Sequence, residues 1–176
     1  LALMPQLVMD DGIVVSSTRV RDMVQAGNVD QAAELLGYPW FLFSEVVGGE
    51  RRGRAMGYPT ANMLPDEKKL TPGEGVYAGA MWHGGRWWPA AISVGRNPTF
   101  LVQGSLRIEA HVIGFHGDLY GRRPLLAFLK RLRLMTRFSG RMSLMKQLAL
   151  DCEETRRVFD ASRPLLKVFH CLPSFD

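Results

Sequence analysis

The chain has 176 residues, of which 47% are hydrophobic and 22% charged, and its formal net charge is +5. This composition excludes a disordered chain and fits one ordinary domain with a small appendage. The longest apolar runs, 76–82 and 87–94, are far shorter than the roughly 20 residues that a membrane-spanning helix requires. No secretory signal is recognisable at the start of the sequence, so we expect a cytoplasmic protein without a membrane segment.

Residues 16–36 predict two short helices. A serine or threonine within 16–18 can cap the first helix, which Gly27 ends. Asn28 can cap the second helix, and Gly37 ends it. The pattern then becomes extended, and we expect the next run to be a β-strand.

A glycine-rich loop with the sequence GERRGRAMGYPTAN, residues 49–62, follows a predicted strand at 40–47. Gly53 and Gly57 lack a Cβ atom, so the backbone between them can turn tightly and direct its N–H groups at an anion. The neighbouring arginines add positive charge. The loop therefore predicts a phosphate site, although the same composition is typical of an exposed Arg/Gly loop.

The end of this loop offers oxygen ligands. Pro59 fixes its own φ and favours an extended conformation before it. In an extended segment Thr60 and Asn62 face the same side. Two neutral oxygens suit Mg²⁺, which takes further ligands from water and from substrate phosphates. A plain Pro-Thr turn is the alternative interpretation.

Short apolar runs beyond the polar connection 64–75 predict a β-structure. Runs 76–82 and 86–94 flank His83-Gly84-Gly85, which indicates a hairpin with a three-residue loop. We expect the three tryptophans near this turn, Trp82, Trp87 and Trp88, to pack together on one face or rim of the β-structure. Further strands are predicted at 106–115 and 124–132. Strands joined without intervening helices favour an antiparallel barrel or sandwich.

The strand at 106–115 alternates in character. Leu106, Ile108, Ala110 and Val112 are expected on one side and Arg107, Glu109, His111 and Ile113 on the other. Glu109 is one of few acids in a basic stretch, and it could simply pair with Arg107 or Arg122 on a solvated face. The basic stretch suits phosphate-bearing small molecules or nucleic acid. We recognise no nucleic-acid-binding module, so a nucleic-acid partner is not expected.

Residues 139–160 change to a helical period. The recurring apolar residues predict an amphipathic helix packed on the β-structure, with a buried stripe formed by Met142, Met145, Ala149, Cys152 and Phe159. Cys152 is then a buried thiol. The tail at 161–176 has no assigned structure.

Several separated motifs resemble the riboflavin kinase family: RGRAMGYPTAN (52–62), GVYAG (75–79), ISVGRNPTF (92–100), RIEAHVIGFHGDLYG (107–121) and LKRLRLMTRF (129–138) with the following helix. The resemblance implies a mainly β fold, a six-stranded antiparallel Greek-key-type β-barrel with a C-terminal α-helix, over residues 38–160. It also implies transfer of the γ-phosphate of ATP to the 5′-hydroxyl of riboflavin, giving FMN and ADP.

The resemblance also implies roles for individual residues. Glu109 is the catalytic base, and Thr60 and Asn62 bind magnesium. ATP would be bound by Gly53, Arg54, Gly57, Tyr58, Pro59, Thr60 and Asn62, and the flavin by Asn97, Pro98, Thr99, Glu109 and Arg133. The chain departs from the family pattern at Arg51, at Tyr58, at Arg96-Asn97 and in the loop 101–105.

The first 37 residues have a resemblance of their own. Residues 16–21, SSTRVR, are similar to the motif that closes the FMN adenylyltransferase domain of bacterial bifunctional FAD synthetases. The His-x-Gly-His motif of that domain is absent, so we expect no adenylyltransferase activity from this chain. A non-catalytic flavin- or nucleotide-binding module, an inactive remnant of a bifunctional FAD synthetase and a CTP-dependent kinase remain alternative interpretations of the whole.

Overall fold

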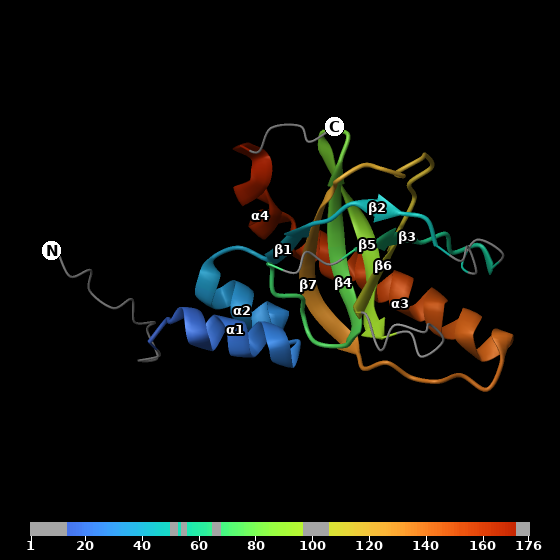
Figure 1. Ribbon diagram of the computed structural model, residues 1–176, viewed down its shortest axis with the longest axis horizontal. Helices are drawn as coiled ribbons and strands as arrows, with labels where there is room; N and C mark the ends of the chain where they lie inside the picture. The colour runs from blue at the N-terminus through green and yellow to red at the C-terminus, as the bar shows by residue number, and fades with distance from the viewer. Residues whose placement is uncertain (1–13, 50–52, 54–55, 65–67, 97–105, 172–176) are drawn as a thin grey trace, which may run out of the picture.

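The structure is a curled antiparallel sheet with helices on its outside (Figure 1). This computed structural model describes residues 14–49, 53, 56–64, 68–96 and 106–171. Within them the sheet has seven strands in the order β1-β7-β4-β5-β6-β3-β2. The strands are β1 (Trp40–Phe43), β2 (Val46–Val47), β3 (Ala61–Met63), β4 (Gly75–His83), β5 (Arg86–Arg96), β6 (Leu106–Val112) and β7 (Leu125–Arg133).

The single strand predicted at 40–47 is wrong, because the run is split at Ser44 and Glu45. β1 pairs with β7 and β2 pairs with β3, at opposite edges of the sheet. A flat sheet of this size would separate its edges by roughly 29 Å, whereas the steps from Phe43 to Val46 reach at most about 11 Å. The sheet therefore has to curl until its edges meet. Backbone hydrogen bonds of 2.9 Å from Val46 to Arg122 and from Gly121 to Val46 hold β2 near the segment that leads into β7.

The central hairpin of β4 and β5 is longer than predicted and its turn is tighter. His83 pairs with Arg86, so Gly84 and Gly85 alone form the turn. Their φ angles of +59° and +74° are those of a two-residue turn that favours glycine. β6 ends at Val112, earlier than predicted, since Gly114 turns the chain with a φ of +76°.

The inner face of the curled sheet holds the main core. The predicted alternation along β6 is confirmed, because Ile108, Ala110 and Val112 lie in this core and Leu106 packs against it. Neighbouring strands contribute other large buried side chains to the same cluster, among them Met63, Tyr77, Met81, Ile92 and Phe128. Residues of the opposite parity on β6 therefore face outward, where the site described below lies.

Both N-terminal helices are confirmed, as α1 (Ser17–Ala26) and α2 (Val29–Leu36). The Ser16 hydroxyl accepts a hydrogen bond from the Arg19 amide, and Gly27 ends α1 in the left-handed conformation. Asn28 is the N-cap of α2, as predicted, but its side chain makes no capping hydrogen bond. That side chain accepts from Arg131 on β7 at 3.3 Å, and Arg131 also donates to Ala26 O at 2.6 Å, which fixes the helix pair to the sheet.

The C-terminal helix is confirmed as α3 (Arg141–Ala161), which packs on β4, β5 and β7. The predicted buried stripe is only partly right. Cys152 and Phe159 are buried, but Met142 is 81% exposed and Ala149 is also exposed. The first turn of α3 extends past the sheet in Figure 1, and Met142 belongs to this turn. The buried positions are instead Asp151, Cys152, Thr155, Val158 and Phe159.

The unassigned tail is part of the fold. It forms α4 (Arg163–Leu166) and the 3-10 helix η2 (Lys167–Cys171), and Leu166 and Phe169 are buried. The Phe169 ring meets Phe41 and Trp87 edge-on, with centroids 5.1 and 5.6 Å apart. Trp87 also packs against Trp82, but Trp88 faces the inner core, so the predicted cluster of three tryptophans is divided between the two faces. Among the described residues, no helix combines the length and apolar character needed to cross a membrane.

Phe169 should be a major contributor to stability. Replacing it by Ala should lower the free energy of unfolding by about 3–5 kcal/mol, because a large buried ring leaves a cavity. Replacing its neighbour Val168, which is 56% exposed, by Ala should change it by less than about 0.5 kcal/mol. Urea unfolding of both variants measures the difference; similar midpoints would show that the tail does not contribute to the core.

Candidate active site

A pocket of about 460 Å³ opens on the outer face of the sheet, between β3, β5 and β6 on one side and α3 on the other. Its walls also include the glycine loop and the segment after β7. The polar lining is formed by Thr60, Asn62, Ser93, Arg96, Arg107, Glu109, His111, Arg133, Thr136 and Asp151. The predicted outward side of β6 is therefore the floor of this pocket.

Strand register places three polar side chains in one row across this floor. Asn62 on β3 is opposite Glu109 on β6, and Glu109 is opposite Ser93 on β5. Side chains that face each other across antiparallel strands have Cβ atoms about 4.5–5.5 Å apart. Asn62 and Glu109, which are 47 positions apart in the sequence, are thus brought into contact range by backbone pairing alone.

The glycine loop closes on itself at Gly53. The carbonyl of Gly53 accepts hydrogen bonds from the amides of Met56 and Tyr58, at 3.0 and 2.9 Å. A Cβ atom on Gly53 would lie 2.2 Å from the Tyr58 carbonyl oxygen, so only glycine fits there. Gly57 has a φ of +82°, which also favours glycine. The two predicted loop glycines are therefore required by close approach and by backbone conformation respectively.

The segment after the loop is held against β6. The His111 Nδ1 atom lies 2.8 Å from the Pro59 carbonyl oxygen, and the Tyr58 ring meets the His111 ring with centroids 5.3 Å apart. Thr60 and Asn62 follow and both line the pocket. A Cβ atom on Gly49 would lie 2.0 Å from the Asn62 amide nitrogen, so a glycine there leaves room for the Asn62 side chain.

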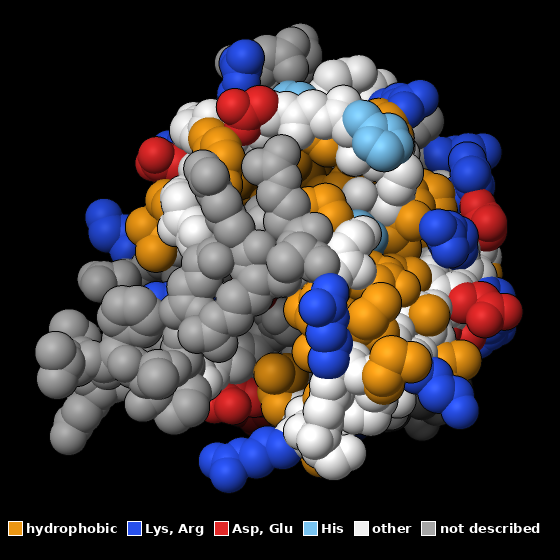
Figure 2. Space-filling view, turned by 90° about the vertical axis from the view of Figure 1, so that its right-hand side faces the viewer, with side chains coloured by type: hydrophobic (Ala, Val, Ile, Leu, Met, Phe, Trp, Pro, Cys, Tyr) orange, Lys and Arg blue, Asp and Glu red, His pale blue; other side chains and the backbone are white. Residues whose placement is uncertain are grey.

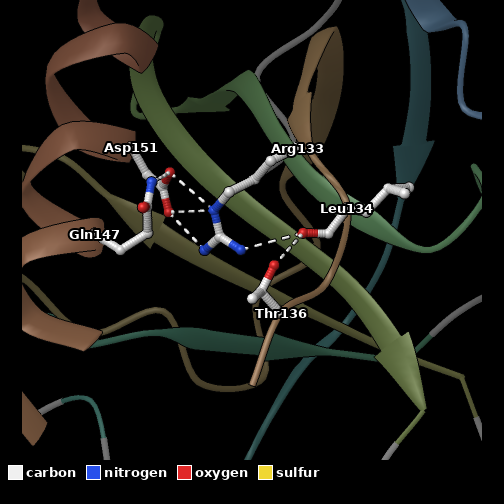
Figure 3. Close-up of polar contacts among 5 residues, drawn as sticks. All are labelled: Arg133, Leu134, Thr136, Gln147 and Asp151. Carbon is white, nitrogen blue, oxygen red and sulfur yellow. Dashed lines mark hydrogen bonds and ion pairs between the residues drawn. The ribbon is translucent and has the colours of Figure 1, made fainter. Parts of the chain in front are cut away.

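Arg133, at the end of β7, joins the sheet to α3 (Figure 3). Its guanidinium donates to both carboxylate oxygens of Asp151, with the shortest contact at 2.8 Å, and to the Leu134 carbonyl at 3.2 Å. Gln147 donates a further hydrogen bond to Asp151 at 2.9 Å. The Asp151 side chain is only 3% exposed and that of Arg133 is 21% exposed, so the carboxylate of this ion pair is nearly removed from solvent.

The wall contributed by α3 and the segment before it is largely apolar. Met135, Phe138, Leu144 and Leu148 line it, and Cys152 lies beside them. Burial raises the pKa of the Cys152 thiol above its ordinary value, so the thiol stays protonated at neutral pH. Figure 2 shows hydrophobic side chains exposed among lysines and arginines on the side of the molecule where α3 begins.

The structure brings together most of the site residues expected from the sequence. Gly53, Tyr58, Thr60, Asn62, Glu109 and Arg133 all line the pocket, and Gly57 and Pro59 lie beside it in the loop. Arg54, Asn97, Pro98 and Thr99 lie outside the described residues.

Six polar lining residues were missed as site residues, namely Ser93, Arg96, Arg107, His111, Thr136 and Asp151. Ser93 and His111 share the period of two with the Glu109 side of the strands, which is the signal that could have found them. No such signal exists for Asp151, an acid on a helix with many charged residues.

Comparison with known proteins gives consistent matches. The model of the riboflavin kinase family, Flavokinase, matches residues 36–159. A relative from Listeria monocytogenes is 35% identical over 145 residues, which cover 82% of this chain and 46% of the relative. A relative from Escherichia coli K12 is 34% identical over 161 residues, which cover 90% of this chain and 50% of the relative. Both are named bifunctional riboflavin kinase/FMN adenylyltransferase, and this chain spans about half of their length.

A solved structure from Streptococcus pneumoniae, described as a macrolide-efflux protein, has the same fold. It aligns with a TM-score of 0.80 at 36% identity, covering 87% of this chain and 50% of the other. The efflux description is a statement about that protein alone.

Removing Arg133 should destabilise the attachment of α3. Arg133→Leu leaves the buried Asp151 carboxylate without its partner, which should cost about 3–5 kcal/mol of unfolding free energy. The double variant Arg133→Leu/Asp151→Leu should regain much of this, because no unpaired charge remains. Arg163→Leu, which breaks an exposed pair with Asp160, serves as control and should cost less than about 1 kcal/mol. Equal losses for Arg133→Leu and Arg163→Leu in urea unfolding would contradict this role.

Proposed function

The chain belongs to the riboflavin kinase family, and we propose that it transfers the γ-phosphoryl group of ATP to the 5′-hydroxyl of riboflavin, giving FMN and ADP. The observation that carries the proposal is the pairing of Asn62 with Glu109 across β3 and β6 within one pocket. An oxygen ligand for Mg²⁺ and a carboxylate base are thereby adjacent in this proposal. Bringing the γ-phosphate and the hydroxyl together supplies much of the catalysis in phosphoryl transfer.

Glu109 is the proposed general base. Its carboxylate orients the ribityl hydroxyl and accepts its proton as the hydroxyl oxygen bonds to the γ-phosphorus and the bond from phosphorus to the ADP oxygen breaks. Ser93 and Asn62 flank it on the neighbouring strands, so the carboxylate lies among neutral polar groups on the pocket floor.

The donor set fits Mg²⁺ brought in with ATP. The described residues contain no cluster of three or more His, Cys, Asp or Glu side chains suited to a dedicated metal centre. Thr60 and Asn62 offer neutral oxygens on one side of an extended segment, which suits an ion that takes most of its ligands from phosphates and water. Bound there, Mg²⁺ would neutralise phosphate charge, while Gly53 and Gly57 shape the loop beside the proposed nucleotide site.

The apolar wall is the proposed flavin side. Met135, Phe138, Leu144 and Leu148 oppose the polar floor, and an isoalloxazine ring needs such an apolar surface. Arg133 contributes at this wall, with its guanidinium already oriented by Asp151. We also propose flavin contacts for Asn97, Pro98 and Thr99, which lie outside the described residues.

We further propose that residues 1–37 are the end of an FMN adenylyltransferase domain and that 38–160 form the kinase module. Support comes from the bifunctional relatives, of which this chain spans about half. The family's six-stranded Greek-key barrel is compatible with the sheet if β1 and β2 count as one broken strand. A cytoplasmic location follows from the requirement for ATP.

Glu109→Gln should lower kcat by about 10²–10⁴-fold, because the amide cannot take the hydroxyl proton. Mg-ATP binding, measured by calorimetry, should be retained. Glu153→Gln, at an exposed position of α3, is the matched control and should leave FMN production unchanged. Near-normal turnover in Glu109→Gln would reject the base assignment, and flavin binding by the wild-type chain without any FMN would indicate a non-catalytic module instead.

Thr60→Ala and Asn62→Ala should each weaken Mg-ATP binding by about tenfold or more, the effect of losing an interaction of about 1.5–3 kcal/mol with a charged group. The magnesium concentration for half-maximal FMN formation should rise in parallel. Gln31→Ala, on the exposed face of α2, is the control. An unchanged magnesium dependence in both variants would count against the ligand assignment.

A further inference from the structure

We propose that His111 is a positioning residue that holds the peptide between Pro59 and Thr60, and so sets where Thr60 and Asn62 stand relative to Glu109. The proposal deepens the proposed kinase function and rests on it for the identity of the ligand. His111 itself transfers no proton in this scheme.

The hydrogen bond has a defined direction. His111 Nδ1 lies 2.8 Å from the Pro59 carbonyl oxygen. A carbonyl oxygen can only accept, so Nδ1 carries the hydrogen and donates. This fixes a contact between segments 52 residues apart in the sequence.

The hydrogen bond from His111 to the Pro59 carbonyl also restrains Thr60. The Pro59 carbonyl and the Thr60 amide belong to one planar peptide unit, so fixing the carbonyl oxygen also fixes the nitrogen on which Thr60 is built. β3 begins only at Ala61, one residue later, and consists of three residues. The side chain of His111 therefore extends the pairing of β3 and β6 beyond the point where the backbone ladder ends.

A second contact supports the ring. The Tyr58 ring lies edge-on to the His111 ring, with an interplanar angle of 67°. Tyr58 is in turn tied to Gly53 through its amide. His111 thus connects the glycine loop, the start of β3 and, two residues along β6, the strand position of Glu109.

The test compares three variants. His111→Ala removes the donor, whereas His111→Asn keeps an N–H group the same number of bonds from Cα as Nδ1. His116→Ala, at an exposed position of the turn after β6, is the histidine control. The loss of one neutral hydrogen bond corresponds to about a 2- to 10-fold change in an equilibrium constant.

We expect His111→Ala to raise KM and Kd for Mg-ATP by about 2- to 10-fold with KM for riboflavin unchanged, and His111→Asn to restore both nucleotide values to within about twofold of wild type. Amide hydrogen exchange at residues 60–62 should be faster in the Ala variant alone. His116→Ala should match wild type throughout.

Two outcomes would overturn the proposal: Ala and Asn variants that behave alike, or an Ala variant whose riboflavin and ATP constants change equally. The exchange and ATP-binding measurements need no turnover. A wild-type chain that forms no FMN would therefore reject the proposed function, while exchange at 60–62 would still decide the role of His111.

Discussion

The two-residue connection between β1 and β2 is the constraint on which the rest of the molecule depends. It joins opposite edges of the sheet, so the sheet must curl, and the curled sheet has one enclosed face and one outer face. Large apolar side chains such as Phe128 and Ile92 fill the enclosed face. Because strand residues alternate, the intervening residues of β3, β5 and β6 have to point outward. Polar chemistry is thereby confined to the outer surface, and a pocket there requires a separate cover.

Helix α3 supplies that cover by two different means along its length. Near its C-terminal end, Val158 and Phe159 pack into an apolar cluster with β4, β7 and the tail. Nearer the pocket the helix is held by the Arg133 and Asp151 pair instead. A continuous apolar contact in that region would press helix and sheet together and fill the cavity. An ion pair formed through the long Arg133 side chain holds helix and sheet at a fixed spacing instead. Its formation carries a desolvation cost, because charged groups are moved away from water.

Much of the fold and part of the site could be predicted from local sequence. Helix ends at Gly27 and Gly37, the alternation around Glu109 and the extended Thr60–Asn62 segment all depend on neighbouring residues, and the structure has them as expected. Asp151 could not be found, since its role depends on Arg133, a residue of another element. The same reason explains Met142, whose apolar character predicts burial but whose helix turn extends past the sheet. The break at Ser44 is set by the pairing of the two edges, which no local pattern records.

The spacing of the outward-facing side chains of β6 sets distances within the proposed active site. Arg107, Glu109 and His111 recur on one side of the strand at intervals of about 6.8 Å. His111 lies at the end near the glycine loop, and Arg107 lies opposite Gly95 at the other end, so Glu109 lies between the glycine loop and the apolar wall. Reaction requires the attacking oxygen and phosphorus to approach to about 3–3.5 Å. Asn62, the proposed magnesium ligand, lies directly across from Glu109, the proposed base. The separation between these two proposed groups is therefore set by strand pairing, and what remains adjustable is the short unpaired segment that His111 contacts.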